Sequence, residues 1–139
     1  MLLKPSKEPC LSFSYPFRRQ LCVGEVLRGA ERIPYELGLR DGSMVMSRMI
    51  KYGREDLMFY VVYDARGVPI TWVNRRLQPP RQTSEREVLE WIQGRIRTLR
   101  SFPGESRFMD LSHVYVVALK RYDRDAVVVS DVFEMEGWS

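Results

Sequence analysis

The chain has 139 residues, of which 45% are hydrophobic and 29% charged, and its formal net charge is +4. This length supports one sizeable hydrophobic core but not two, and the spread of aromatic residues along the chain argues against long disordered segments. No apolar run reaches the roughly 18 residues that a membrane-spanning helix needs. We therefore predict one soluble domain at residues 13–139, preceded by an extended tail at residues 1–12, and no membrane partner.

The basic residues are mostly arginine, with eighteen arginines and four lysines making up the 22. The planar guanidinium group matches phosphates and carboxylates. The excess therefore indicates an anionic partner, such as nucleic acid, a phosphorylated cofactor or an acidic protein face. GC-rich codon usage explains it equally well.

The two cysteines, Cys10 and Cys22, form no Cys–X–X–Cys or Cys/His zinc pattern, so no metal is expected. The first ten residues, MLLKPSKEPC, do not predict a signal peptide. We therefore expect a reduced protein in the cytoplasm. Cys22 is predicted to lie on the apolar side of a helix, in the core.

The first two predicted elements are helices. Apolar residues recur at helical spacing over residues 17–33. A shorter helix is predicted over residues 44–52, because Ser43 is a good N-cap and Gly53 follows its end. The buried side of this second helix would consist of Val45, Met49 and Ile50.

The remaining elements are four strands and one more helix. Residues 57–64 and 68–73 are predicted to form a β-hairpin, and residues 107–119 and 126–134 two later strands. Between these pairs lies the strongest helix signal, in which Ser84 and Glu87 form a capping box. Its apolar stripe would consist of Val88, Leu89, Ile92, Ile96 and Leu99. These elements predict an α+β fold.

The second strand of the hairpin ends in side chains suited to binding. Trp72 and Asn74 share one face of a strand while Val73 takes the other. Trp72 either covers an edge of the core or lines a cleft in which Asn74 is a hydrogen-bonding neighbour.

Three arginines, Arg75, Arg76 and Arg81, precede the helix capped by Ser84. The N-terminus of a helix presents free N–H groups and a partial positive charge, which favour anions. These groups either hold a phosphate or pyrophosphate or form a solvated basic loop. The segment contains no glycine, so it is not a glycine-rich phosphate loop.

Asp110 and His113, the only histidine, are the candidate catalytic residues. Asp110 interrupts an otherwise apolar predicted strand, where a buried carboxylate needs a partner. His113 either acts as a general base near neutral pH or is a hydrogen-bonded surface residue. Residues three apart on a regular strand point to opposite faces, so a direct Asp110–His113 pair requires a bulge.

Four segments carry a resemblance to a known family: SYPFRRQLCVGEVLRGAERIP (14–34), YVVYDARGVPITWVN (60–74), PGESRFMDL (103–111) and AVVVSDVFEMEG (126–137). In this order they resemble the RTX-toxin-activating lysine acyltransferases, a divergent branch of the GCN5-related N-acetyltransferase fold. The resemblance implies a mixed sheet with flanking helices. It also implies transfer of an acetyl or other acyl group from a thioester carrier, acetyl-CoA or acyl carrier protein, to a lysine of a protein target.

The resemblance assigns roles to individual residues. Asp110 matches the essential aspartate of the family and would orient the attacking amine, with His113 as its base. The family's catalytic histidine aligns with Arg18, which stays protonated and cannot be a base at neutral pH. The lip of a gap between splayed central strands, where the thioester would insert, would be formed by Trp72, Asn74, Arg75 and Arg76.

Arg18 therefore leads to a second hypothesis: a catalytically inactive binding module of this fold that inhibits an acidic host protein, as small bacteriophage proteins do, in the bacterial cytoplasm. It predicts that Asp110→Asn and His113→Ala keep activity, whereas charge reversal at Arg75 or Arg76 does not. Nucleic-acid binding ranks third, because no known nucleic-acid-binding motif accompanies the basic charge. A second copy of the chain is a further candidate partner.

Overall fold

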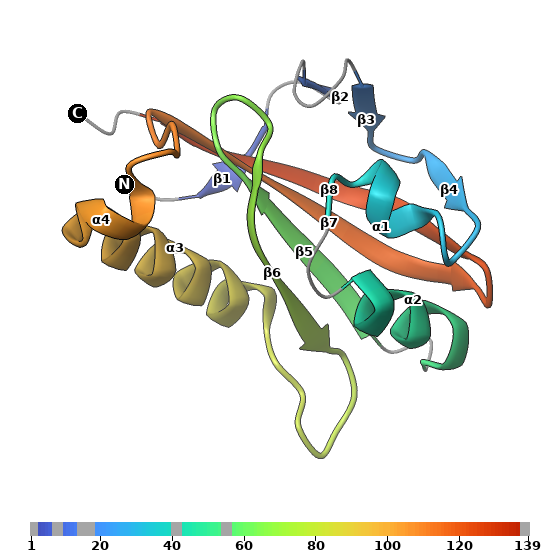
Figure 1. The fold of residues 1–139 in the computed structure, drawn as a ribbon. Coiled ribbons are helices and arrows are strands. Elements are labelled where there is room, and N and C mark those ends of the chain that lie inside the picture. The colour runs from blue at the N-terminus through green and yellow to red at the C-terminus, as the bar shows by residue number, and fades with distance from the viewer. Residues whose placement is uncertain (1–2, 7–9, 14–18, 40–42, 54–56, 137–139) are drawn as a thin grey trace.

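The computed structural model describes residues 3–6, 10–13, 19–39, 43–53 and 57–136. These residues form a six-stranded sheet with helices on both faces, and a separate two-stranded sheet (Figure 1). The elements in chain order are β1 (Lys4–Pro5), β2 (Cys10–Phe13), β3 (Arg19–Cys22), β4 (Val26–Arg28), α1 (Ile33–Glu36), α2 (Ser43–Tyr52), β5 (Leu57–Tyr63), β6 (Pro69–Arg76), α3 (Glu85–Ser101), α4 (Pro103–Ser106), β7 (His113–Asp123) and β8 (Ala126–Glu136). The predicted α+β class is confirmed.

The large sheet has the strand order β1-β8-β7-β5-β6, and β4 also pairs with β8. All of these pairs are antiparallel. Helix α3 carries the chain from β6, at one edge, back across β5 to β7 (Figure 1). Strand β5 is paired on both sides, so no gap opens between it and its neighbours, and the transferase fold stays a prediction.

Two hydrophobic cores lie on the two faces of this sheet. The first is closed by α1, α2 and the β2–β3 sheet, and the second by α3 (Figure 1). All seven residues of β5 are buried, with Phe59 and Val61 in the first core and Tyr60 and Val62 in the second. Alternation across two cores explains why this strand is apolar without interruption.

The predicted helix that begins after Ser84 is confirmed as α3. The Ser84 hydroxyl accepts a hydrogen bond from the Glu87 N–H at 3.1 Å, as the capping box predicts. Its buried apolar residues are Val88, Ile92, Ile96 and Leu99, whereas Leu89 is half-buried. Each fully buried aliphatic side chain stabilises the fold by about 1.5–3 kcal/mol, so this stripe fixes α3 to the sheet.

The predicted hairpin and the helix over residues 44–52 are also confirmed, as β5–β6 and α2. Gly67 in the hairpin turn has φ of 89°, and a Cβ there would lie 2.6 Å from the Phe13 ring. Only glycine fits this turn. The buried side of α2 was partly wrong, because Met46 is buried whereas Val45 is 54% exposed.

The predicted helix over residues 17–33 is wrong in the described part of that range. Strands β3 and β4 occupy it, and α1 begins only at Ile33. Gly24 and Gly29 have φ of 90° and 92°, which a right-handed helix excludes, and they turn the chain instead. Of the apolar residues at helical spacing, Leu21, Ala30 and Ile33 still reach the first core, from β3, a turn and α1 rather than from one helix face.

The prediction that the two cysteines are reduced is wrong. Cys10 and Cys22 lie opposite each other on β2 and β3, with Cα atoms 3.9 Å apart, and form a disulfide. A helix over residues 17–33 would have hidden this pairing, since only the strand register brings the two sulfurs together. The cytoplasmic location stays a prediction. None of the described helices combines the length and apolarity needed to cross a membrane.

The segments before β2 and β7 also differ from their predictions. The predicted tail contributes β1 and most of β2, and both Leu3 and Leu11 are buried. The strand predicted from residue 107 begins only at His113, because residues 103–106 form α4 and residues 107–112 form turns and irregular structure.

Candidate functional site

Four of the six residues predicted to bind a cofactor lie on β6, on both of its faces, whereas Arg81 and Ser84 lie in the segment between β6 and α3. Trp72 is half-buried against the first core, with its ring centroid 6.3 Å from that of Phe59. Asn74 is exposed on the same face, and its amide nitrogen lies 3.3 Å from the Met49 sulfur. Trp72 and Asn74 therefore share a face, as predicted, but at the outer edge of the sheet and not at a central gap.

Arg75 points to the opposite face, toward the second core and α3. Its Nε donates to the Thr83 carbonyl at 2.8 Å and its Nη1 to the Tyr60 hydroxyl at 3.1 Å. The guanidinium also lies 3.7 Å from the Glu85 carboxylate. This carboxylate accepts a hydrogen bond from the Tyr60 hydroxyl at 3.0 Å. Arg75 thus fixes the start of α3 to the sheet, and its charge is already balanced.

Tyr60 gives this cluster a measurable pH dependence. Burial, together with the nearby Glu85 carboxylate, raises the pKa of Tyr60 from 10.0 to about 12. The pKa of Tyr60 is higher in the folded chain than in the unfolded chain, so the contribution of its neutral hydroxyl to the stability of the fold is complete below pH 10.0. This contribution is lost as the pH rises through about 12. Urea midpoints measured across this range should fall less in Tyr60→Phe than in the wild type. Identical falls would contradict this prediction.

Arg76 and Arg81 differ from Arg75 because both are exposed, and among the described residues neither guanidinium group forms an ion pair or hydrogen bond. Arg76 shares the face of Trp72 and Asn74. The Thr83 N–H donates to the Arg76 carbonyl at 2.9 Å, which holds the following loop beside the end of β6. We refer to Arg76 and Arg81 as the basic edge.

The charge of the basic edge is not balanced locally in sequence. Residues 65–84 contain four arginines and no aspartate or glutamate. The Ser84 hydroxyl, one of the groups predicted to hold a phosphate, accepts the Glu87 N–H as the cap of α3. Of the six predicted cofactor-binding residues, the arginines free to meet an anion are therefore the two of the basic edge.

Asp110 is exposed and precedes β7, so the prediction that it interrupts an apolar strand is wrong. Its carboxylate accepts hydrogen bonds from the Ser112 hydroxyl at 2.6 Å and the Ser112 N–H at 3.1 Å, which lower the pKa of Asp110. Its own backbone N–H donates to the buried Asp64 carboxylate at 3.0 Å. Asp110 is thus an ionised turn residue.

His113 is the first residue of β7 and is half-buried. Its ring stacks on Tyr115 at a centroid distance of 4.4 Å, and its Nε2 lies 3.5 Å from the Glu134 carboxylate on β8. The contacts described for Asp110 and His113 therefore come from residues near them and from β8, and not from the side chains of β6. A pocket of about 580 Å³ borders Asp110 and Phe108, and no residue of β6 lines it.

Arg18, at the family's catalytic position, lies outside the described residues. Its neighbour Arg19 lies over the rings of Phe13 and Tyr63, with its guanidinium carbon 5.1 and 5.0 Å from their centroids, and the two rings contact each other at a centroid distance of 4.8 Å. The Arg19 guanidinium donates to the Gly67 carbonyl at 3.1 Å, and burial lowers its pKa. Arg19 therefore ties the β2–β3 sheet to the hairpin turn.

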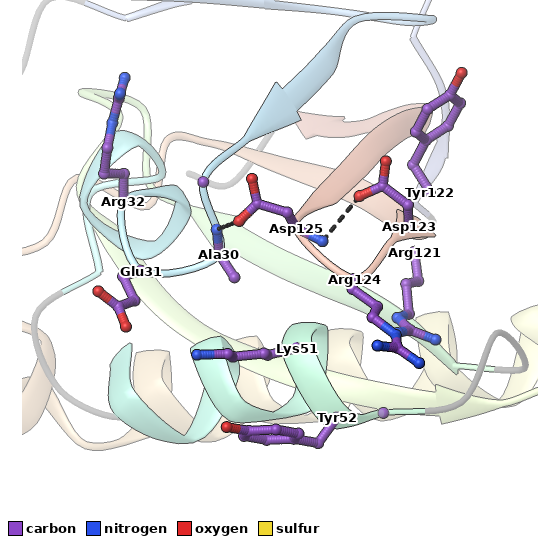
Figure 2. A pocket seen from close by; sticks show the side chains of 12 residues that line it. Ala30, Glu31, Arg32, Lys51, Tyr52, Arg121, Tyr122, Asp123, Arg124 and Asp125 are labelled. Carbon is purple, nitrogen blue, oxygen red and sulfur yellow. Dashed lines mark hydrogen bonds between the residues drawn. The ribbon is translucent and has the colours of Figure 1, made fainter.

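A wide cleft of about 1010 Å³ lies elsewhere, between the β4–α1 turn, the end of α2 and the β7–β8 turn (Figure 2). Its charged lining residues are Glu31, Arg32, Lys51, Arg121, Asp123, Arg124 and Asp125. This cleft was not predicted from the sequence, because its lining residues come from three segments that lie far apart in the chain.

Most charges of the cleft have structural partners. The Arg121 Nε donates to the Ile50 carbonyl at the end of α2 at 2.8 Å, and the Asp125 carboxylate accepts the Ala30 N–H at 2.9 Å (Figure 2). Arg28 pairs with Asp123 at 3.1 Å. Because these charged groups already bond to neighbouring segments, the β7–β8 turn is better suited to joining those segments than to binding a ligand.

No group of three or more histidine, cysteine, aspartate or glutamate residues is placed to hold a metal ion in the described part of the chain. Searches of protein-family models, curated proteins and solved structures return no match to this chain. The site must therefore be interpreted from its own geometry.

Proposed function

We propose that the protein is a binding module whose basic edge docks on an acidic part of another protein. The observation that carries this proposal is the exposure of Arg76 and Arg81 without an anionic partner among the described residues, in a 20-residue stretch that lacks acidic residues. A patch of exposed positive charge steers an acidic partner toward the surface and fixes how the partner is aligned on it. Occupying that surface of the partner would block its other ligands, which is the inhibitory role predicted from the sequence.

The same geometry gives the acyltransferase hypothesis less support. The thioester would need a gap between strands, and β5 is paired on both sides. The amine would need a base, and Asp110 is exposed while the His113 ring lies against Tyr115. Acyl transfer stays a prediction, and calorimetric titration with acetyl-CoA tests it directly, since a transferase should show saturable binding.

Affinity capture from a bacterial lysate tests the binding proposal. The immobilised wild-type chain should retain a discrete acidic protein, identified by mass spectrometry, and Arg76→Glu should lose it because like charges then face each other. The matched control is Arg95→Glu, which reverses an exposed arginine in α3. Retention of the same proteins by all three chains would overturn the proposal.

A further inference from the structure

Strand β6 has an outer edge that faces no other strand in the part of the chain that the structure describes. It is the last strand in the sheet order, and its pairing with β5 uses only its inner edge. Among the described residues, the one further backbone hydrogen bond to β6 is that from the Thr83 N–H to the Arg76 carbonyl. Because alternate residues of an antiparallel strand direct both backbone groups outward, this edge presents donors and acceptors that have no backbone partner among the described residues before the Arg76 carbonyl.

The two backbone features that protect an edge strand, a proline and a bulge, lie at the start of β6. Pro69 lacks an N–H, and the register shift leaves Ile70 as a bulge, since Tyr63 pairs with Pro69 and Val62 with Thr71. The residues from Thr71 to Arg76 contain no proline or glycine and pair with β5 in regular register. This regular part has the length of an ordinary strand.

We propose that an extended acidic segment of the partner pairs with β6 between Thr71 and Arg76 and so adds a strand to the sheet. This inference rests on the proposed function and specifies how the partner is recognised. Main-chain hydrogen bonds along the edge would supply affinity, and side chains flanking it would supply specificity.

The side chains of β6 define what the segment carries. Trp72, Asn74 and Arg76 lie on one face, and Val73 and Arg75 on the other. In antiparallel pairing, the residue opposite Arg76 is followed by those opposite Val73 and Trp72 three and four positions later. An acid opposite Arg76 and apolar residues at these two later positions complete the match.

Charge favours an acidic segment over a second copy of the chain. Pairing two β6 strands would bring two basic edges to one interface, and among the described residues neither Arg76 nor Arg81 has an ion-pair partner that would offset this charge. Like charges at one interface repel each other. An acidic strand instead neutralises the basic edge.

Peptide binding to the full chain, followed by fluorescence anisotropy, tests the strand pairing. The probe is a labelled peptide with Glu followed by Val and Phe three and four positions later. We expect saturable binding that weakens by at least about tenfold when the N–H groups facing β6 are N-methylated, because the hydrogen bonds that they donate to the strand edge are lost. N-methylation of the alternate set, which faces away, is the matched control and should leave affinity unchanged.

Two variants check the charge matching. Lys in place of the peptide Glu should weaken binding to the wild type, and Arg76→Glu should reverse that preference. Equal affinity of the two N-methylated peptides, or no saturable binding of the parent peptide, would overturn the strand pairing. A concentration-dependent dimer that protects the β6 amides from exchange would instead identify a second copy as the occupant and overturn it as well.

The two proposals fail separately. If capture depends on Arg76 while the two N-methylated peptides bind alike, the binding function stands and the added strand does not. If peptides pair with β6 but no acidic protein is captured, the edge is competent and the proposed function fails.

Discussion

Replacing Asp64 with alanine should lower the free energy of unfolding by about 3–4 kcal/mol, because each orphaned amide costs about 1 kcal/mol or more. The side chain is fully buried. Its carboxylate accepts the N–H groups of Arg66 and Val68 at 2.9 Å and that of Asp110 at 3.0 Å, and it lies 3.5 Å from the Arg66 guanidinium. The substitution leaves three amides without these acceptors and removes one of the bonds between the hairpin and the turn before β7, which the Ala65 N–H also joins by donating to the Asp110 carbonyl at 2.8 Å. Urea unfolding followed by tryptophan fluorescence measures the loss.

Two further variants control for this effect. Asp64→Asn keeps one carbonyl oxygen and should fall between wild type and alanine. Asp123→Ala removes an exposed turn carboxylate that accepts the Asp125 N–H and pairs with Arg28. It should destabilise far less, because water replaces the lost bonds. Similar losses for Asp64→Ala and Asp123→Ala would show that Asp64 does not hold the two segments together.

Replacing Arg75 with alanine should lower the free energy of unfolding much more than replacing the adjacent Arg76. Arg75→Ala removes hydrogen bonds to Thr83 and Tyr60 and leaves Glu85 without its cation, so we expect a loss of about 2 kcal/mol. Arg76→Ala should change stability by about 0.5 kcal/mol or less, because its side chain is exposed. Urea unfolding distinguishes them, and equal losses would contradict the two assigned roles.

This contrast also refines the sequence hypothesis. Charge reversal at Arg75 would act through unfolding and cannot report on binding, whereas Arg76 reports on binding alone. The alternation of a strand already places the two side chains on opposite faces. The partners of Arg75, however, come from β5 and from the segment before α3, and no local pattern indicates those contacts.

The elements that could be predicted carry their signals within a few residues. The capping box of Ser84 and Glu87, the apolar stripe behind it and the glycine in the hairpin turn each act locally, and α3 and β5–β6 are confirmed. The helix predicted over residues 17–33 is wrong because the spacing of the apolar residues there suits both a helix and two strands linked by a turn. Gly24 and Gly29 were the signal that distinguishes the two.

Long-range contacts account for the rest. The Cys10–Cys22 bond depends on the β2–β3 register, and the bond from Asp110 to Asp64 spans 46 residues. Without that second contact, Asp110 looked like a carboxylate buried in a strand. The open edge of β6 likewise follows from strand order, which the sequence of a single strand does not determine.

The most direct test of the central claim is the affinity of the captured acidic partner for two variants. One is Arg76→Glu, and the other combines Asp110→Asn with His113→Ala. Surface plasmon resonance at two salt concentrations should show at least about tenfold weaker binding by Arg76→Glu, mostly through slower association, and wild-type affinity for the double variant. Loss of binding in the double variant with full binding by Arg76→Glu would contradict the account and return the function to Asp110 and His113.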